Sequence, residues 1–209
     1  MTVLFAMAAR PESGQVPYIL MGSDSLEINL DKDGNLKNKN EDAKKIYKIN
    51  DKLVSYSGRL DICFREDFLK FLNKNDCELS ELYKLVYQYV YDYMVNVEIA
   101  PDAKCAIYIG CCNNSIPELA EIRLEKRELS KAIHKHYVAE KDQLIIKVAG
   151  SIRKPEDDDL FYSILGNMTE RCPDLALPRV RKVAKEYLEK AAARYPETCN
   201  QNIKFERLR

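Results

Sequence analysis

Residues 2–9 read Thr-Val-Leu-Phe-Ala-Met-Ala-Ala, an almost wholly apolar run that begins at the second residue of the chain. A continuous apolar run of this length is typical of a strand buried on both faces. Pro11, Gly14 and Pro17 mark a loop, after which residues 18–24 form a second apolar segment with a polar end. The pattern predicts two adjacent strands joined by a hairpin, with the start of the chain held in a sheet.

The next segments predict an exposed excursion, a hairpin and two helices. Residues 31–42 are rich in Asp, Asn, Lys and Gly, which favours a solvent-exposed loop. Residues 46–49 and 52–56 have short strand patterns that predict a hairpin ending at Ser57-Gly58. Apolar residues at helical spacing predict helices over 60–72 and 79–97. The apolar stripe of the second helix consists of Leu82, Leu85, Val86, Tyr89, Val90 and Met94.

In the remainder of the chain, strand patterns are again followed by helical patterns. Strand patterns occupy residues 105–111 and 143–148, and a short terminal strand is expected near 203–205. Residues 155–165 and 178–193 have helical patterns, the second opening with a proline. Since no repeat or linker divides the 209 residues, we expect one domain over 1–209, an α+β sheet system with helices on its outer faces.

Composition narrows the classes of function. Thirty-three basic residues balance thirty-three acidic ones, which disfavours binding to nucleic acid. We expect a soluble cytoplasmic protein, since there is no secretion signal and no apolar stretch long enough to cross a membrane. The seven cysteines lack the paired spacing of a zinc site or a disulfide scaffold, which suits reduced thiols in a cytosol.

Thr2 is a candidate nucleophile. A threonine hydroxyl needs a base to take its proton, and the α-amino group of an N-terminal threonine, with a pKa near ~8, is such a base close to neutral pH. Removal of Met1 would make Thr2 the first residue, and its small side chain permits that removal. Threonine in second position is common, however, so this residue alone predicts little.

Three stretches of sequence, considered together, strengthen the hypothesis that Thr2 is a nucleophile. They are the run from Thr2 to Met7, the segment Ile19-Leu-Met-Gly-Ser-Asp24-Ser25, and the segment Ala43-Lys-Lys45-Ile-Tyr-Lys-Ile-Asn-Asp-Lys-Leu-Val-Ser-Tyr-Ser-Gly58. In order and approximate spacing they resemble the first third of proteasome β-subunits and HslV-type peptidases, which are N-terminal-nucleophile (Ntn) hydrolases. The resemblance covers most of the chain in element order, and it is close only up to Gly58.

The resemblance implies a catalytic role for each matching position. Thr2 would be the nucleophile. Lys45 would lower the pKa of the Thr2 hydroxyl, and Asp24 would orient Lys45. Gly58 would offer its backbone amide to the oxyanion. A surface ion pair is the alternative for Lys45, because Lys44, Lys45 and Lys48 form a basic run, and an ordinary turn glycine is the alternative for Gly58.

Two later positions match the family more loosely. Ser151 follows Val148-Ala-Gly150, like the glycine-serine segment that approaches the nucleophile, and would tune the α-amino group; a helix-capping serine is the alternative. After the last helix the family has an aspartate and then a serine. Thr198 can replace that serine, whereas Tyr195 does not replace the aspartate.

The resemblance implies a four-layer αββα sandwich, a homo-oligomer such as a ring, and a threonine peptidase. The enzyme would cleave peptides or unfolded proteins, an unfoldase partner being one option, and its chemistry needs no metal or organic cofactor. One rival is an inactive assembly subunit, favoured by Tyr195. The other is an acyl transferase or peptide ligase, which product analysis with an added amine would distinguish. The substrate pocket would involve positions 29–33 and 56–60, including Arg59.

Other features receive structural interpretations. His134 and His136 suit a surface better than a metal site, and of the adjacent Cys111 and Cys112 we expect one to be buried. A cluster of tyrosines spreads over more than one face of the helix predicted at 79–97, which predicts contact with a neighbouring subunit as well as with the core. The cluster comprises Tyr83, Tyr87, Tyr89, Tyr91 and Tyr93.

Overall fold

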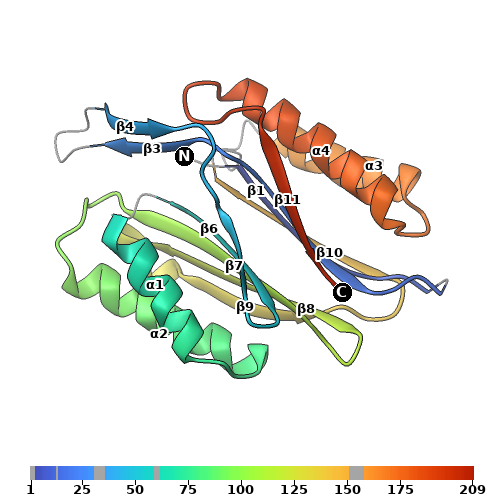
Figure 1. Cartoon of the computed structure of the whole chain (residues 1–209), viewed down its shortest axis with the longest axis horizontal. Helices are drawn as coiled ribbons and strands as arrows, with labels where there is room; N and C mark the ends of the chain where they lie inside the picture. Colours follow the sequence, from blue (N-terminus) through green and yellow to red (C-terminus); the bar gives the residue numbers. More distant parts are fainter. Residues whose placement is uncertain (1–2, 13, 31–35, 59–61, 151–157) are drawn as a thin grey trace.

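The computed structural model describes residues 3–12, 14–30, 36–58, 62–150 and 158–209. Strands β1 (Val3–Arg10) and β2 (Tyr18–Asp24) lie at the centre of a four-stranded sheet, and they pair antiparallel as the predicted hairpin requires. Strand β10 (Gln143–Gly150) flanks β1, and β11 (Ile203–Leu208) flanks β2 (Figure 1). The start of the chain is therefore held between two neighbouring strands.

A second, five-stranded antiparallel sheet has its strands in the order β5-β6-β7-β8-β9. Its members are β5 (Ile46–Ile49), β6 (Lys52–Gly58), β7 (Lys104–Asn113), β8 (Ile116–Glu125) and β9 (Ile133–Val138). A 3-10 helix over Lys126–Lys131 joins the last two strands. The predicted hairpin ending at Gly58 is confirmed as the β5–β6 pair.

Strand β1 is apolar throughout because its alternate residues are buried in two different hydrophobic clusters. Val3, Phe5 and Met7 belong to one hydrophobic cluster, shared with the helices near the C-terminus. Leu4 and Ala6 belong to another, shared with residues of the five-stranded sheet. Because successive strand residues point to opposite faces, a strand covered on both sides needs an unbroken apolar run.

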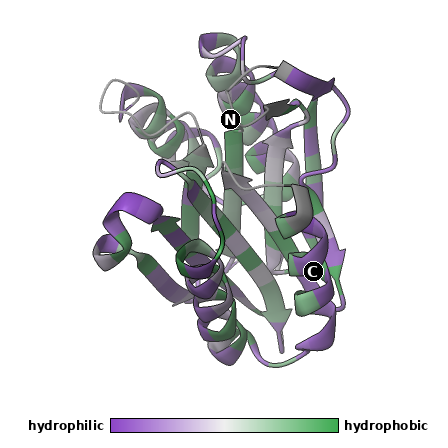
Figure 2. Ribbon diagram, turned by 90° about the vertical axis from the view of Figure 1, so that its left-hand side faces the viewer, coloured by the Kyte–Doolittle hydropathy of each residue, from purple (hydrophilic) through white to green (hydrophobic). Residues whose placement is uncertain are grey.

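Helices cover the outer face of each sheet. Helices α1 (Ile62–Lys74) and α2 (Leu79–Asn96) pack on the five-stranded sheet, and α3 (Asp158–Arg171) and α4 (Leu177–Arg194) pack on the four-stranded one (Figure 1). Figure 2 shows the central strands as largely hydrophobic, whereas the helices carry many hydrophilic residues. The expected α+β architecture with helices on its outer faces is confirmed.

The buried stripe of α2 differs from the predicted one at Leu85, whose exposed fraction is 38%. The residue after it, Val86, is fully buried, and neighbouring helix residues point about 100° apart. The buried residues of α2 are Leu79, Leu82, Val86, Val90 and Met94. Their three- and four-residue spacing leaves no room for Leu85 on the same face.

Two pairs of strands differ from the sequence-based expectation. Within the excursion predicted over 31–42, β4 (Leu36–Asn40) pairs with β3 (Glu27–Leu30), although residues 37–42 are exposed as expected. Such a hairpin can form without an apolar pattern, because its two strands satisfy each other's backbone N–H and C=O groups. Strands β8 and β9 were not predicted either. In β8, buried Glu121 pairs with Arg123 at 2.5 Å and interrupts the apolar pattern, and β9 has no buried residue.

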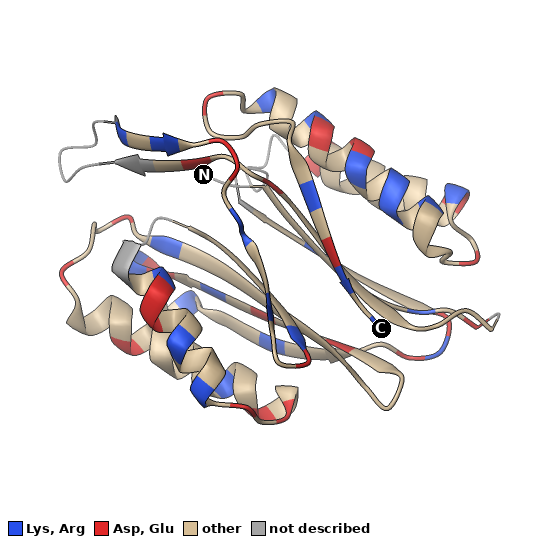
Figure 3. Ribbon diagram, in the orientation of Figure 1, with Lys and Arg blue, Asp and Glu red and all other residues tan. Residues whose placement is uncertain are grey.

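Charged side chains of both signs are interspersed over the helices and loops (Figure 3). Helix α1 carries three basic and two acidic residues, whereas on α4 six basic residues outnumber two acidic ones. Within the described residues, no helix is long and apolar enough to span a membrane.

Candidate active site

The strand registers bring Val3, Asp24 and Gly150 to one end of the four-stranded sheet. Val3 pairs with Gly150, and Asp24 pairs with Ile203, so the start of β1, the end of β2 and the end of β10 are neighbours. In the other sheet, Ile46 pairs with Ser55. The residue before Ile46 and the end of β6 therefore lie at the same end of the β5–β6 hairpin.

Asp24 is fully buried at the end of β2, and its carboxylate accepts three kinds of hydrogen bond. Its Oδ1 accepts the backbone amide of Val3 at 2.9 Å, and its Oδ2 accepts that of Leu26 at 3.0 Å. Both oxygens lie 3.1 Å from the Nζ of Lys45. Hydrogen bonds from these three donors fix the orientation of the carboxylate, so Asp24 ties the start of β1 to Lys45.

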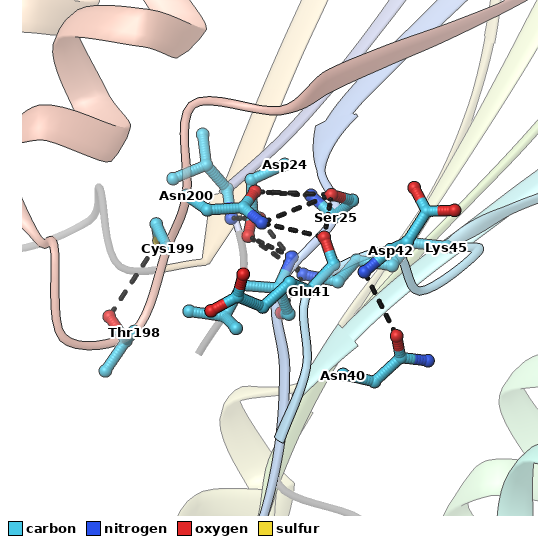
Figure 4. Close-up of polar contacts among 11 residues, drawn as sticks. Asp24, Ser25, Asn40, Glu41, Asp42, Lys45, Thr198, Cys199 and Asn200 are labelled. Atoms are coloured by element: carbon cyan, nitrogen blue, oxygen red, sulfur yellow. Dashed lines mark hydrogen bonds and ion pairs between the residues drawn. The ribbon is translucent and has the colours of Figure 1, made fainter.

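The Lys45 side chain is buried, with an exposed fraction of 8%. Its Nζ donates to Asp24 and to the carbonyl oxygen of Leu26. Burial lowers the pKa of Lys45, and the Asp24 carboxylate opposes that effect. The neighbouring Lys44 is exposed, with its Nζ over the ring of Tyr47. Of the lysines in the basic run, Lys45 is the one that the structure brings to Asp24 (Figure 4).

Gly58 ends β6 with φ at +152°, a conformation that side chains rarely adopt. A Cβ at this position would lie 2.7 Å from the Cα of Cys105 and closer still to the carbonyl oxygen of Lys104. Glycine is therefore required by the pairing of β6 with β7 as well as by any role of its amide.

Replacement of Gly58 by alanine tests this backbone requirement. We expect Gly58→Ala to lower the free energy of unfolding by about 2–4 kcal/mol, because the new Cβ is strained and overlaps the β7 backbone. Urea unfolding followed by circular dichroism measures the effect. The matched control is Gly166→Ala, since a Cβ there meets nothing within 4 Å. Equal stability of the two variants would contradict the geometry.

Three predicted positions remain to be placed. Thr2 and Ser151 lie outside the described residues, although their neighbours Val3 and Gly150 pair with each other. Arg59 and positions 31–33 of the expected pocket also lie outside them. Thr198 lies in the turn after α4, where its Oγ1 is 3.8 Å from the Cys199 Sγ.

The turn that carries Thr198 is shaped by Tyr195. The carbonyl oxygen of Tyr195 accepts the backbone amides of Thr198 at 3.1 Å and Cys199 at 2.9 Å. The Tyr195 side chain packs against the cluster beneath α4. Cys199 is buried and lies near enough to Lys45 to influence its pKa. Tyr195 thus contributes to the core beneath α4 with its side chain and shapes the turn with its carbonyl oxygen.

A polar cluster beside Asp24 was not predicted from the sequence. Ser25 is fully buried, and its Oγ donates to the carbonyl oxygen of Glu41 at 2.6 Å. Asn200 contacts both residues, from a position 175 residues after Ser25 (Figure 4). The only sequence signal is that Ser25 follows Asp24 and that Asn200 follows the Thr198-Cys199 pair.

The remaining candidates are accounted for by local packing. His134 stacks on Tyr87, with ring centroids 4.2 Å apart, and His136 lies 2.8 Å from Glu118. Cys111 is buried, as expected for one of the pair, and burial raises its pKa to about 12. Tyr89 stacks on Phe71 of α1. Across the described residues, no group of three His, Cys, Asp or Glu side chains could hold a metal ion.

Comparison with known proteins identifies the fold. No protein-family model matches the sequence, and no curated protein matches it. Among solved structures, Thiobacillus denitrificans BPH, in complex with epoxomicin, matches with a TM-score of 0.56 and 11% identity, over 100% of this chain and 98% of that one. Eukaryotic HslV from Trypanosoma brucei matches with the same TM-score and identity, over 98% of each chain. This chain has the proteasome β-subunit and HslV fold. At 11% identity the similarity shows the HslV-like fold alone, so activity has to be argued from the residues.

Proposed function

We propose that this protein is a threonine peptidase of the Ntn-hydrolase type, with Thr2 as its nucleophile after removal of Met1. One observation carries the proposal. A buried carboxylate–ammonium pair, Asp24 with Lys45, is hydrogen-bonded to the backbone of Val3, the residue that follows Thr2. A buried charge pair is costly to maintain, and buried pairs of this kind cluster at functional sites.

The pair suits the activation of a neighbouring hydroxyl. The Thr2 Oγ attacks the peptide carbonyl, forming a tetrahedral intermediate and then an acyl-enzyme, while the α-amino group takes the hydroxyl proton and passes it to the leaving amine. The Lys45 ammonium stabilises the developing alkoxide, and Asp24 holds that ammonium in place. The Gly58 amide stabilises the oxyanion, and water then releases the acyl group.

Ser151 and Thr198 have supporting roles in this proposal. Ser151 follows Gly150, which pairs with Val3, and it tunes the basicity of the α-amino group. Thr198 takes the place of the family serine in the turn after α4. We keep the substrate pocket at positions 29–33 and 56–60, of which 31–33, 59 and 60 lie outside the described residues.

The architecture and assembly belong to the same proposal. One domain of 209 residues forms the four-layer αββα sandwich, supported by a hydrophobic cluster between the sheets and one beneath each helix pair. Copies of the chain assemble into a ring or related homo-oligomer, which would admit peptides or unfolded proteins, with an unfoldase as a partner for folded substrates. The HslV-like fold supports this assembly.

The rival is an inactive assembly subunit with the same fold. Tyr195 favours it, because this residue packs into the core beneath α4 where the family has an aspartate. Without that carboxylate the proton network around the nucleophile differs from the family pattern. The two proposals agree on the fold and disagree on turnover.

Peptide cleavage by the Met1-free protein separates the two proposals. The purified protein is incubated with an unfolded protein such as casein, and new N-termini are quantified by mass spectrometry. We expect cleavage, and we expect epoxomicin, the compound bound to Thiobacillus BPH, to block it. The control is the same protein with an uncleaved N-terminal tag, which removes the free amine and should be inactive. Absence of cleavage with Thr2 as the first residue would favour the inactive subunit.

A further inference from the structure

Asn200 bridges two chain segments beside the candidate site through both ends of its side-chain amide. Its Oδ1 accepts the backbone amide of Ser25 at 3.1 Å and lies 3.3 Å from the Ser25 Oγ. Its Nδ2 donates to the carbonyl oxygen of Glu41 at 2.9 Å. The opposite amide orientation would set donor against donor and acceptor against acceptor, so the contacts define how this side chain is placed.

The two bridged segments carry the two members of the buried ion pair. Ser25 directly follows Asp24, and Glu41 lies four residues before Lys45. Ser25 also holds the second segment itself, since its Oγ donates to the Glu41 carbonyl and its own carbonyl accepts the Ala43 amide at 2.8 Å. In Figure 4 dashed lines join the Asn200 amide to both Ser25 and Glu41.

Asn200 itself is held by a third segment, the turn that contains Thr198 and Cys199. That turn ends α4 and leads into β11, which pairs with β2 at Asp24. Half-buried Asn200 therefore joins the end of β2, the approach to β5 and the C-terminal segment at one point. No apolar or acidic side chain of similar size offers both the donor and the acceptor that this junction uses.

We infer that Asn200 is a positioning residue, whose amide sets the placement of Lys45 against Asp24 by holding Glu41 to Ser25. The inference rests on the proposed role of Lys45 in activating Thr2. Without the amide, the segment before Lys45 loses one of its ties to β2, and water gains access to the ion pair. A loosened ammonium is less desolvated and less well placed for the nucleophile.

The titration of Lys45 tests this inference without relying on activity. Burial lowers the pKa of Lys45, against the charges of Asp24, Cys199 and Glu27, so we expect Asn200→Ala to raise that pKa toward its ordinary value. The readout is the Cε resonance of Lys45 in protein with carbon-13-labelled lysine, assigned by its loss in Lys45→Met. Ser25→Ala removes the hydroxyl contacts to Glu41 and Asn200 but keeps the Ser25 backbone amide, so it weakens the same junction and serves if Asn200→Ala does not fold.

Asn202→Ala is the matched control, since exposed Asn202 contacts the Asp42 side chain at 3.2 Å from the same segment. We expect it to leave the Lys45 titration unchanged. In the cleavage assay, Asn200→Ala should lower kcat by about 10- to 100-fold with a smaller effect on KM. If Lys45 titrates in Asn200→Ala as in the native protein, the inference is overturned. Inactivity of the native protein would count against the peptidase alone, because the titration still decides the role of Asn200.

Discussion

Thr2→Ala is expected to abolish peptide cleavage, with a loss in kcat of about 10⁶-fold. The variant retains an N-terminal amine after removal of Met1, but it has no hydroxyl to form the acyl-enzyme. Removal of the nucleophile alone costs a hydrolase nearly as much as removal of its whole catalytic group, which sets the size of the effect. The measurement is the initial rate of casein or fluorogenic peptide cleavage by the Met1-free variant.

Thr2→Ser is the matched control for this loss. Serine keeps the hydroxyl and the N-terminal amine while it removes only the methyl group, so we expect most of the activity to remain. The start of β1 is tied down at Val3 by Asp24 and by pairing with Gly150, so both variants should fold equally well. Native-level cleavage by Thr2→Ala would place the chemistry elsewhere in the molecule.

Lys45→Met is expected to have the second-largest effect. It leaves the Asp24 carboxylate fully buried with its two backbone donors and without its cation, which should lower the free energy of unfolding by about 3–5 kcal/mol. Loss of the ammonium should also lower kcat by about 10²–10⁴-fold. Urea unfolding and the cleavage assay measure the two effects separately.

Lys44→Met is the matched control for Lys45→Met, since Lys44 is the adjacent residue and is exposed. We expect it to be close to native in both assays. The double variant Asp24→Asn with Lys45→Met should recover part of the stability, because no unpaired charge remains buried. Equal effects of Lys44→Met and Lys45→Met would show that the buried pair has no special role.

Much of the fold could be predicted because most strands and helices have regular apolar patterns. The two-sided burial of β1 required an unbroken apolar run, and that run is visible in the sequence. Strand β8 was missed because Glu121 is buried among compensating partners, Arg123 and Lys147, that no local pattern reveals. Leu85 was misassigned because spacing alone did not settle the edge of the α2 stripe.

The candidate site also has a part that could be predicted from the sequence and a part that could not. The pairing of Asp24 with Lys45 followed from the family resemblance, and the structure brings these two residues together. The role of Asn200 could not be anticipated, because its contacts to Ser25 and Glu41 depend on how β11 returns to β2. Likewise, the strain at Gly58 depends on its pairing with Cys105 in β7.

The most direct test of the central claim is the site of a covalent adduct. The Met1-free protein is treated with a covalent probe for nucleophilic threonine, its intact mass is measured, and the modified residue is located by fragmentation of the N-terminal peptide. We expect one adduct per chain, on Thr2, and none on Thr2→Ala. Protein that begins with Thr2 and forms no adduct, or forms it at another residue, would contradict the proposal that Thr2 is the nucleophile.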